Sequence, residues 1–267
     1  MNTVNNGQNN WSFGFGVSVL VASGFLAILG EILTHRYFLD LVYVSLPAHA
    51  WVEILGAVLG GGIAVLVWST WKRSEKERPA ECFLLASAFG SMGVLDIIHA
   101  LVLPGNLFVW LHMFAMLVGA IFFAAAFFPK NIFKIKSAVS PVMVTAAAAA
   151  LGSMFLLNPS LAPVVFLENQ MMPLALNISL VTGVLFLATG VYFMGGQIEE
   201  CRAEEMLIAN FCMLSAASAM LFYVSEVWHA EWWVWHAIRF FGYVITLLGL
   251  LVMGKKNSDA EPNKNTI

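Results

Sequence analysis

Eight apolar stretches, each about as long as a membrane-spanning helix, take up nearly all of this chain. The hydrocarbon core of a bilayer is about 30 Å thick, and a helix needs about 20 apolar residues to cross it. These runs are continuous rather than alternating, which argues against a membrane β-barrel. We predict an all-α integral membrane protein, a bundle of about eight transmembrane helices, at residues 12–34, 49–71, 80–103, 106–128, 138–157, 172–195, 206–227 and 232–254.

Composition supports this fold class and excludes others. Hydrophobic residues make up 60% of the 267 positions and charged residues only 11%, which is typical of membrane proteins. The helices leave no room for a soluble catalytic domain, and no basic stripe suited to nucleic acid is present. We expect one membrane domain over residues 1–255 and a polar, disordered cytoplasmic tail over residues 256–267.

Basic residues set the orientation of the bundle. In an eight-helix topology, eleven of the 13 Lys and Arg residues fall on one side of the membrane. The positive-inside rule makes this the cytoplasmic side, so both termini are predicted to be cytoplasmic, in a multi-pass protein of the cell inner membrane. The eleven residues are Lys72, Arg73, Lys76, Arg78, Lys130, Lys134, Lys136, Arg202, Lys255, Lys256 and Lys264.

Ionisable groups gather in the opposite, outer half of the predicted bundle, where all six histidines lie near helix ends. Intramembrane ionisable groups are energetically expensive, face the bundle interior and commonly mark function. Residues three or four apart share a helix face, and this spacing joins His49 to Glu53, Asp96 to His99, Glu226 to His229, and His236 to Arg239 and Tyr243.

Arg239 requires an anion at its own depth, because an unpaired buried charge is strongly destabilising. Glu53, Asp96 and Glu226 are the candidates. His229 stays undecided, and His35, beside Arg36 at a helix end, is expected to be solvated. The predicted ligand-binding set is His49, Glu53, Asp96, His99, His112, Glu226, His236, Arg239 and Tyr243.

Two other interpretations of this set stay open. The residues form a polar network that only fixes helix register, or they bind a transition metal or a haem. Imidazole ligands would come from His49, His99, His112 and His236, although no local metal motif such as HExxH is present. No nucleophile elbow or phosphate loop is visible either, so we do not expect an enzyme.

Tryptophan and glycine positions give two further expectations. Trp110, Trp228, Trp232, Trp233 and Trp235 are predicted to form an aromatic belt at the outer interface, with a place in a ligand pocket as the alternative. The small residues at 56–62 allow close helix contact, which we expect to occur within the chain rather than in a dimer.

The motifs together resemble a known family. An HxxxE segment at residues 49–53, a DxxHA segment at 96–100 and an HxxRxxxY segment at 236–243 stand in this order. The sequence resembles the bacterial membrane-associated sensor domains, closest to their third type, over about residues 49–250. The resemblance implies a signal-input role for His49, Glu53, Asp96, His99, His236 and Arg239. Family members usually precede histidine kinase, diguanylate cyclase or phosphodiesterase domains.

The function predicted from these observations is a sensory module of the bilayer that binds a small ligand, a proton or a metal in an outer pocket. No output domain follows the last helix, so a separate cytoplasmic or membrane signalling protein is expected to read the change. One alternative is a haem- or metal-binding redox protein. Another is a small transporter or lipid-handling protein, although the paired broken helices of many transporters are missing.

Overall fold

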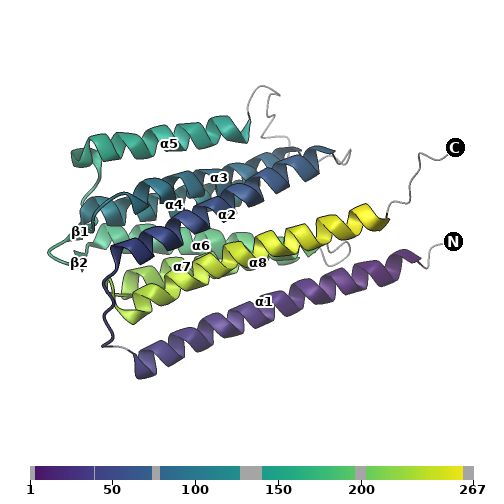
Figure 1. The fold of residues 1–267 in the computed structure, drawn as a ribbon, viewed down its shortest axis with the longest axis horizontal. Helices are drawn as coiled ribbons and strands as arrows, with labels where there is room; N and C mark the ends of the chain where they lie inside the picture. Colours follow the sequence, from purple (N-terminus) through teal and green to yellow (C-terminus); the bar gives the residue numbers. More distant parts are fainter. Residues whose placement is uncertain (1–3, 39, 74–78, 127–139, 196–202, 261–267) are drawn as a thin grey trace.

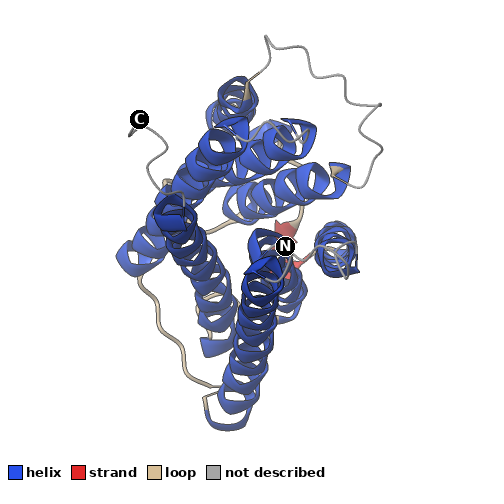
Figure 2. Ribbon diagram, turned by 90° about the vertical axis from the view of Figure 1, so that its right-hand side faces the viewer, coloured by secondary structure: helices blue, strands red, loops and turns tan. Residues whose placement is uncertain are grey.

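The computed structural model describes residues 4–38, 40–73, 79–126, 140–195 and 203–260. Within these residues eight α-helices run side by side along one direction (Figure 1). Only two short strands accompany them (Figure 2). The helices are α1 (Val4–Tyr37), α2 (Leu46–Arg73), α3 (Pro79–Ala100), α4 (Asn106–Ala125), α5 (Pro141–Leu157), α6 (Pro173–Gly195), α7 (Ala203–Val224) and α8 (Ala230–Ala260).

The predicted all-α membrane bundle is confirmed. In the described part of the chain, seven helices are long and apolar enough to cross a membrane. The exception is α5, whose 17 residues extend only about 25 Å at a rise of 1.5 Å per residue. Pro79, Pro141 and Pro173 open their helices, where the missing N–H of proline costs no hydrogen bond.

The arrangement places α3 inside the bundle and α1 and α5 at opposite edges (Figure 1). Nearly every residue of α3 from Cys82 to Phe89 is buried, whereas α1 exposes large apolar side chains such as Phe25 and Leu26. Exposed apolar side chains on a membrane helix face lipid and need no protein partner. Polar contacts join α1 to two neighbours: Ser23 bonds to Asn210 of α7, and His35 lies 3.0 Å from Glu231 of α8. Val19 adds apolar packing against Leu207 and Met253.

At one end of the bundle, connecting segments bond to one another. Tyr43 N–H donates to the carbonyl of Trp228 at 2.9 Å, and Ala230 N–H donates to the carbonyl of Leu41 at 2.9 Å. The connection between α1 and α2 is thereby tied to the connection between α7 and α8. This is the end that the sequence assigns to the outer face of the membrane.

A short hairpin covers the same end. After the 3₁₀ turn η1 (Pro159–Leu161), strands β1 (Phe166–Leu167) and β2 (Gln170–Met171) pair antiparallel. The two residues between the strands, Glu168 and Asn169, both have positive φ, as a type I′ turn requires. The Asn106 side chain accepts hydrogen bonds from the backbone N–H groups at 165 and 166, which fixes the hairpin to the start of α4.

The opposite end carries the predicted cytoplasmic segments. The start of α1 and the end of α8 both lie there, as an even number of crossings requires (Figure 1). Basic positions 76, 78, 130, 134, 136, 202 and 264 lie outside the described residues. The helix α8 continues past the boundary predicted at residue 255 and ends at Ala260, and the remainder of the predicted tail, 261–267, is also outside the described residues.

Candidate functional site

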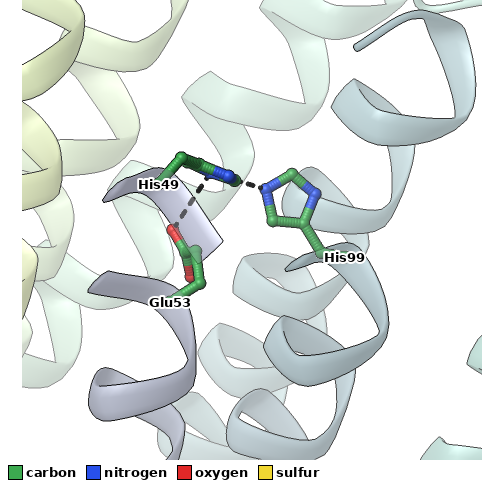
Figure 3. A group of neighbouring side chains, drawn as sticks. All are labelled: His49, Glu53 and His99. Carbon is green, nitrogen blue, oxygen red and sulfur yellow. Dashed lines mark hydrogen bonds and ion pairs between the residues drawn. The ribbon is translucent and has the colours of Figure 1, made fainter. Parts of the chain in front are cut away.

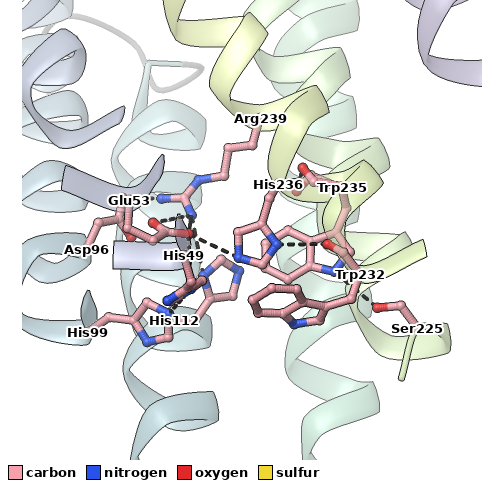
Figure 4. A network of polar contacts seen from close by, with 11 residues as sticks. His49, Glu53, Asp96, His99, His112, Ser225, Trp232, Trp235, His236 and Arg239 are labelled. Carbon is pink, nitrogen blue, oxygen red and sulfur yellow. Dashed lines mark hydrogen bonds and ion pairs between the residues drawn. The ribbon is translucent and has the colours of Figure 1, made fainter. Parts of the chain in front are cut away.

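Eight of the nine predicted site residues meet in the half of the bundle predicted to be the outer one, where four helices contribute them. Figure 4 labels these residues apart from Tyr243, whose ring centroid lies 5.9 Å from the Arg239 guanidinium. All eight are at least nine-tenths buried. We call them the polar cluster: His49 and Glu53 from α2, Asp96 and His99 from α3, His112 from α4, and His236, Arg239 and Tyr243 from α8. The three-and-four spacing read from the sequence places each pair within the polar cluster on one helix face.

Arg239 is the centre of the polar cluster. Its Nη2 donates to Asp96 Oδ2, and its Nη1 lies 3.2 Å and 3.4 Å from the two carboxylate oxygens of Glu53. One guanidinium therefore joins α8 to both α2 and α3. Because its planar fork presents several donors in fixed directions, arginine can bridge two carboxylates in a way that lysine cannot.

Arg239 also determines the protonation of His112. Its Nη1 donates to His112 Nδ1 at 3.4 Å. A guanidinium has no acceptor, so Nδ1 must present its lone pair, and the His112 ring is neutral with its proton on Nε2. This contact adds α4 to the helices that Arg239 connects.

His236 has the opposite arrangement, with one nitrogen committed as a donor. Its Nδ1 lies 2.8 Å from the carbonyl oxygen of Trp232, which can only accept, so Nδ1 carries a proton. Its Nε2 faces Glu53 Oε1 at 3.4 Å. If both groups lacked a proton there, two lone pairs would face each other in a water-poor site. A proton or another cation is needed between His236 and Glu53.

His49 and His99 form a second close pair (Figure 3). Their Nε2 atoms are 3.3 Å apart, and His49 Nε2 is also 3.9 Å from Glu53 Oε1. In the absence of an ion, one of the two Nε2 atoms must carry a proton and donate a hydrogen bond, and the other must accept that hydrogen bond.

Aromatic rings enclose the polar cluster on its outer side. Trp235 stacks on His236 with ring centroids 3.5 Å apart, and Trp232 lies 3.9 Å from the same ring. Phe108 packs against both members of the other pair, 4.2 Å from His99 and 5.0 Å from His49. These rings exclude water, which strengthens the electrostatic contacts inside.

This enclosure corrects the predicted aromatic belt. Trp232 and Trp235 are each only 1% exposed, so they cannot anchor the protein at the lipid interface. Trp110 is also buried. The indole of Trp235 donates to Ser225 Oγ at 3.0 Å, a partner within the protein rather than a lipid headgroup.

Small residues let α2 approach the cluster closely. Gly60 faces the Tyr243 ring so tightly that a Cβ at residue 60 would lie 3.2 Å from Tyr243 Cε1. Gly56 borders the same ring, and a Cβ at Gly93 would lie 3.0 Å from the carbonyl of Ala57. The glycine stripe therefore serves contacts within the chain, as expected from the sequence.

Glu226 is the predicted site residue that the structure places elsewhere. Because α7 ends at Val224, Glu226 lies in the following loop, with its side chain 81% exposed and 3.2 Å from His229. Glu226 is not a counter-ion of Arg239. Glu226 and His229 both lie outside the polar cluster. His35 is 71% exposed as expected, but it is paired with Glu231 rather than only solvated.

A cavity of about 360 Å³ opens above the cluster at the outer end. Three connecting segments line it, and its lining includes Phe108, Asn169, Glu226 and Trp228. Phe108 and Trp228 belong to both the cavity and the enclosure, since the Trp228 ring lies 6.1 Å from His49. The volume is within the range of small-molecule sites. A cation or small ligand from the outer side would therefore meet these two rings before the polar cluster.

The formal charge of the cluster is unbalanced. With neutral imidazoles, the carboxylates of Glu53 and Asp96 and the single guanidinium of Arg239 leave one net negative charge. A buried uncompensated charge is costly in a low-dielectric interior. The cluster is therefore suited to take up one positive charge.

The family described as a membrane-associated sensor domain, MASE3, matches residues 42–256. The chain belongs to the MASE3 family. Neither the curated proteins nor the solved structures contain a match to it. The MASE3 segment contains all of the polar cluster, helices α2 to α7 and α8 as far as residue 256, whereas α1 precedes it.

Membership in MASE3 confirms the resemblance read from the three motifs and establishes a membrane sensor domain. Sequence patterns favoured an interface belt for Trp232 and Trp235 over a place in a ligand pocket, and they gave no prediction for Phe108. Trp232 lies four residues before His236 and Trp235 four residues before Arg239 on α8, a spacing that places each pair on one helix face. Phe108, four residues before His112 on α4, has the same spacing.

Proposed function

We propose that this MASE3 domain is the signal-input module of a bacterial inner-membrane signalling system, and that the polar cluster is its receptor site. The observation that carries the proposal is Arg239, which joins α2, α3, α4 and α8 through buried polar contacts. A change of charge or occupancy at such a site alters contacts in four helices at once. A purely apolar core has no comparable point of control.

A receptor must hold two arrangements that its ligand distinguishes, since a ligand shifts an equilibrium only through unequal affinity. The cluster offers such a difference. A positive charge near Glu53 and His236 competes with Arg239 for the Glu53 carboxylate, whose oxygens lie within 3.4 Å of both. Weakening the contact between Arg239 and Glu53 loosens α8 from α2.

The backbone around the outer cavity supports access from the outer side. Trp228 has φ of 72°, in the left-handed region that bulky residues rarely occupy. Strained backbone of this kind is commonly found at ligand clamps and switch regions. Trp228 lines the cavity and also contacts His49, so its ring lies where a ligand passes.

The inner half of the bundle argues for a receptor rather than a transporter. Phe89, Phe123 and Phe211 are fully buried below the cluster, and they pack on one another and on Tyr243. A transport path through the described bundle would have to displace this core.

A haem between histidines fits the cluster poorly. Axial nitrogens on opposite faces of an iron lie about 4 Å apart, given metal–nitrogen bonds of about 2.0–2.1 Å. The Nε2 atoms of His49 and His99 are only 3.3 Å apart, and Phe108 packs on both rings. A porphyrin plane would need to separate side chains that are in contact.

The test is whether the polar cluster controls the far ends of α2 and α8. We would place spin labels at Val65 and Val252, exposed positions about 18–20 Å along the helix axes from Glu53 and Arg239. The full chain, with its native cysteines replaced, would be studied in lipid nanodiscs by pulsed electron paramagnetic resonance. We expect Glu53→Gln to shift the distance distribution between the labels.

Glu226→Gln is the matched control, because it makes the same chemical change at an exposed glutamate outside the cluster. It should leave the distance distribution unchanged. If Glu53→Gln and His99→Gln both yield folded protein with the wild-type distribution, the cluster does not communicate with the other end and the proposed receptor role is wrong.

A further inference from the structure

We infer that His49, Glu53 and His99 form a binding site for a divalent transition-metal ion of the zinc class. This inference rests on the proposed function, since it names the chemistry that the receptor site would recognise. One ligand atom from each residue lies within 4.8 Å of the other two, and all three side chains are buried (Figure 3).

The distances between the three ligand atoms are close to those expected around a tetrahedral metal ion. A tetrahedral ion with bonds of about 2.0–2.1 Å holds its ligand atoms roughly 3.3–3.4 Å apart. The His49 and His99 Nε2 atoms are 3.3 Å apart, and His49 Nε2 lies 3.9 Å from Glu53 Oε1. The His49–His99 distance already equals a tetrahedral edge, and no two of the three ligand atoms are more than 4.8 Å apart, so binding an ion requires them to close by about 1.5 Å at most.

His236 supplies a second, independent observation. Its buried Nε2 has no hydrogen-bond partner among the described residues and faces Glu53 Oε1 at 3.4 Å, which is again close to a tetrahedral edge. Its Nδ1–H donates to the Trp232 carbonyl at 2.8 Å. Histidines that bind metals commonly donate their other N–H to a carbonyl in this way. His236 Nε2 therefore lies beside the carboxylate of the proposed site with its lone pair free, although it is not in the group whose ligand atoms all lie within 4.8 Å of one another.

A second group of possible ligands, Glu53, Asp96 and His112, lies equally close together. The Arg239 guanidinium already donates to all three of these residues. A cation placed among them would face a permanent positive charge. The ion is therefore expected between Glu53 and the pair His49 and His99. Arg239 holds the Glu53 carboxylate from the opposite side.

The donor set indicates the class of ion. Two or three imidazoles and one carboxylate suit zinc and its neighbours, whereas calcium and magnesium prefer oxygen ligands and copper(I) prefers sulfur. The net negative charge of the cluster also favours a cation. A single proton shared by Glu53 and His236 would balance that charge as well, and metal analysis separates the two occupants.

The experiment measures metal bound to the purified full chain in detergent. After equilibration with Zn²⁺ and gel filtration, we expect one zinc per chain by elemental analysis. Substituting Co²⁺ should give the intense visible absorption of a tetrahedral ion. His99→Gln and Glu53→Gln should abolish both signals, whereas His229→Gln and His35→Gln, outside the cluster, should retain them.

The folding of each variant is checked by the gel-filtration profile, and the near-isosteric glutamine substitutions keep the buried volume filled. A zinc-free wild-type protein, or zinc that survives both cluster substitutions, would overturn the metal site. If zinc is absent but Glu53→Gln still shifts the distance between Val65 and Val252, only the metal inference fails. If Glu53→Gln removes zinc without any shift, the metal site stands and the receptor role fails.

Discussion

Replacing Arg239 with methionine is the sharpest test of how the bundle is held together. The substitution keeps an unbranched side chain of similar reach but removes the guanidinium that contacts Glu53, Asp96 and His112. Two carboxylates then remain buried without a cation. Breaking a buried ion pair by removing one partner costs about 3–5 kcal/mol, because the remaining charge is left uncompensated.

This magnitude translates into a large thermal shift. For a chain of this size, 1 kcal/mol corresponds to roughly 2–4 °C in Tm, so Arg239→Met should lower Tm by about 6–20 °C. The measurement is thermal unfolding in a mild detergent, followed by near-ultraviolet circular dichroism of the buried tryptophans. Arg36→Met, which removes an exposed arginine from the end of α1, should change stability by no more than about 0.5 kcal/mol.

A triple variant separates charge from packing. Adding Glu53→Gln and Asp96→Asn to Arg239→Met removes all three charges while nearly preserving volume. Replacing a complete buried charge network by neutral groups is often close to neutral in stability, so much of the lost Tm should return. The reasoning is refuted if Arg239→Met unfolds within about 2 °C of the wild type, or if the triple variant is no more stable than Arg239→Met.

Two further predictions concern topology and close packing. Reporter fusions after Lys76 and after Trp228 should report opposite sides of the membrane, with Lys76 cytoplasmic, and a shared side would overturn the eight-helix topology. Gly60→Val should cost about 1–3 kcal/mol, because its Cβ would press on Tyr243 at 3.2 Å. Gly61→Ala, whose Cβ would meet nothing within 4 Å, should be neutral or stabilising in the same thermal assay.

Much of the fold was predictable because a bilayer limits the choices so strongly. Continuous apolar runs located most helix ends to within about three residues, although α1 begins eight residues before its predicted start and α8 ends six residues after its predicted end. The basic residues predicted which ends lie together. The shortness of α5 was less evident, because its apolar run begins at residue 138, whereas the helix begins at Pro141 among the described residues. Helix ends depend on capping and on neighbouring segments, which hydropathy does not report.

The candidate site was predictable only along single helices. Spacing correctly paired His49 with Glu53 and Asp96 with His99, because three or four residues return to the same helix face. It could not decide which helices are neighbours, so Glu226 remained a candidate partner for Arg239. Glu226 is not a partner of Arg239 because α7 ends at Val224, which leaves Glu226 in an exposed loop.

The position of the cluster on α8 suggests how an input would reach the other side of the membrane. His236, Arg239 and Tyr243 occupy the first half of a helix that runs without a break to Ala260. Arg239 and Tyr243 are among the residues by which α8 meets α2: Arg239 contacts Glu53, and Tyr243 packs on Gly56 and Gly60. Because Tyr243 packs closely on glycine, α8 can pivot there without first compressing a side chain of α2. A weaker contact between Arg239 and Glu53 at one end would thus be converted into displacement of α8 at the other, which is the motion that labels at Val65 and Val252 detect.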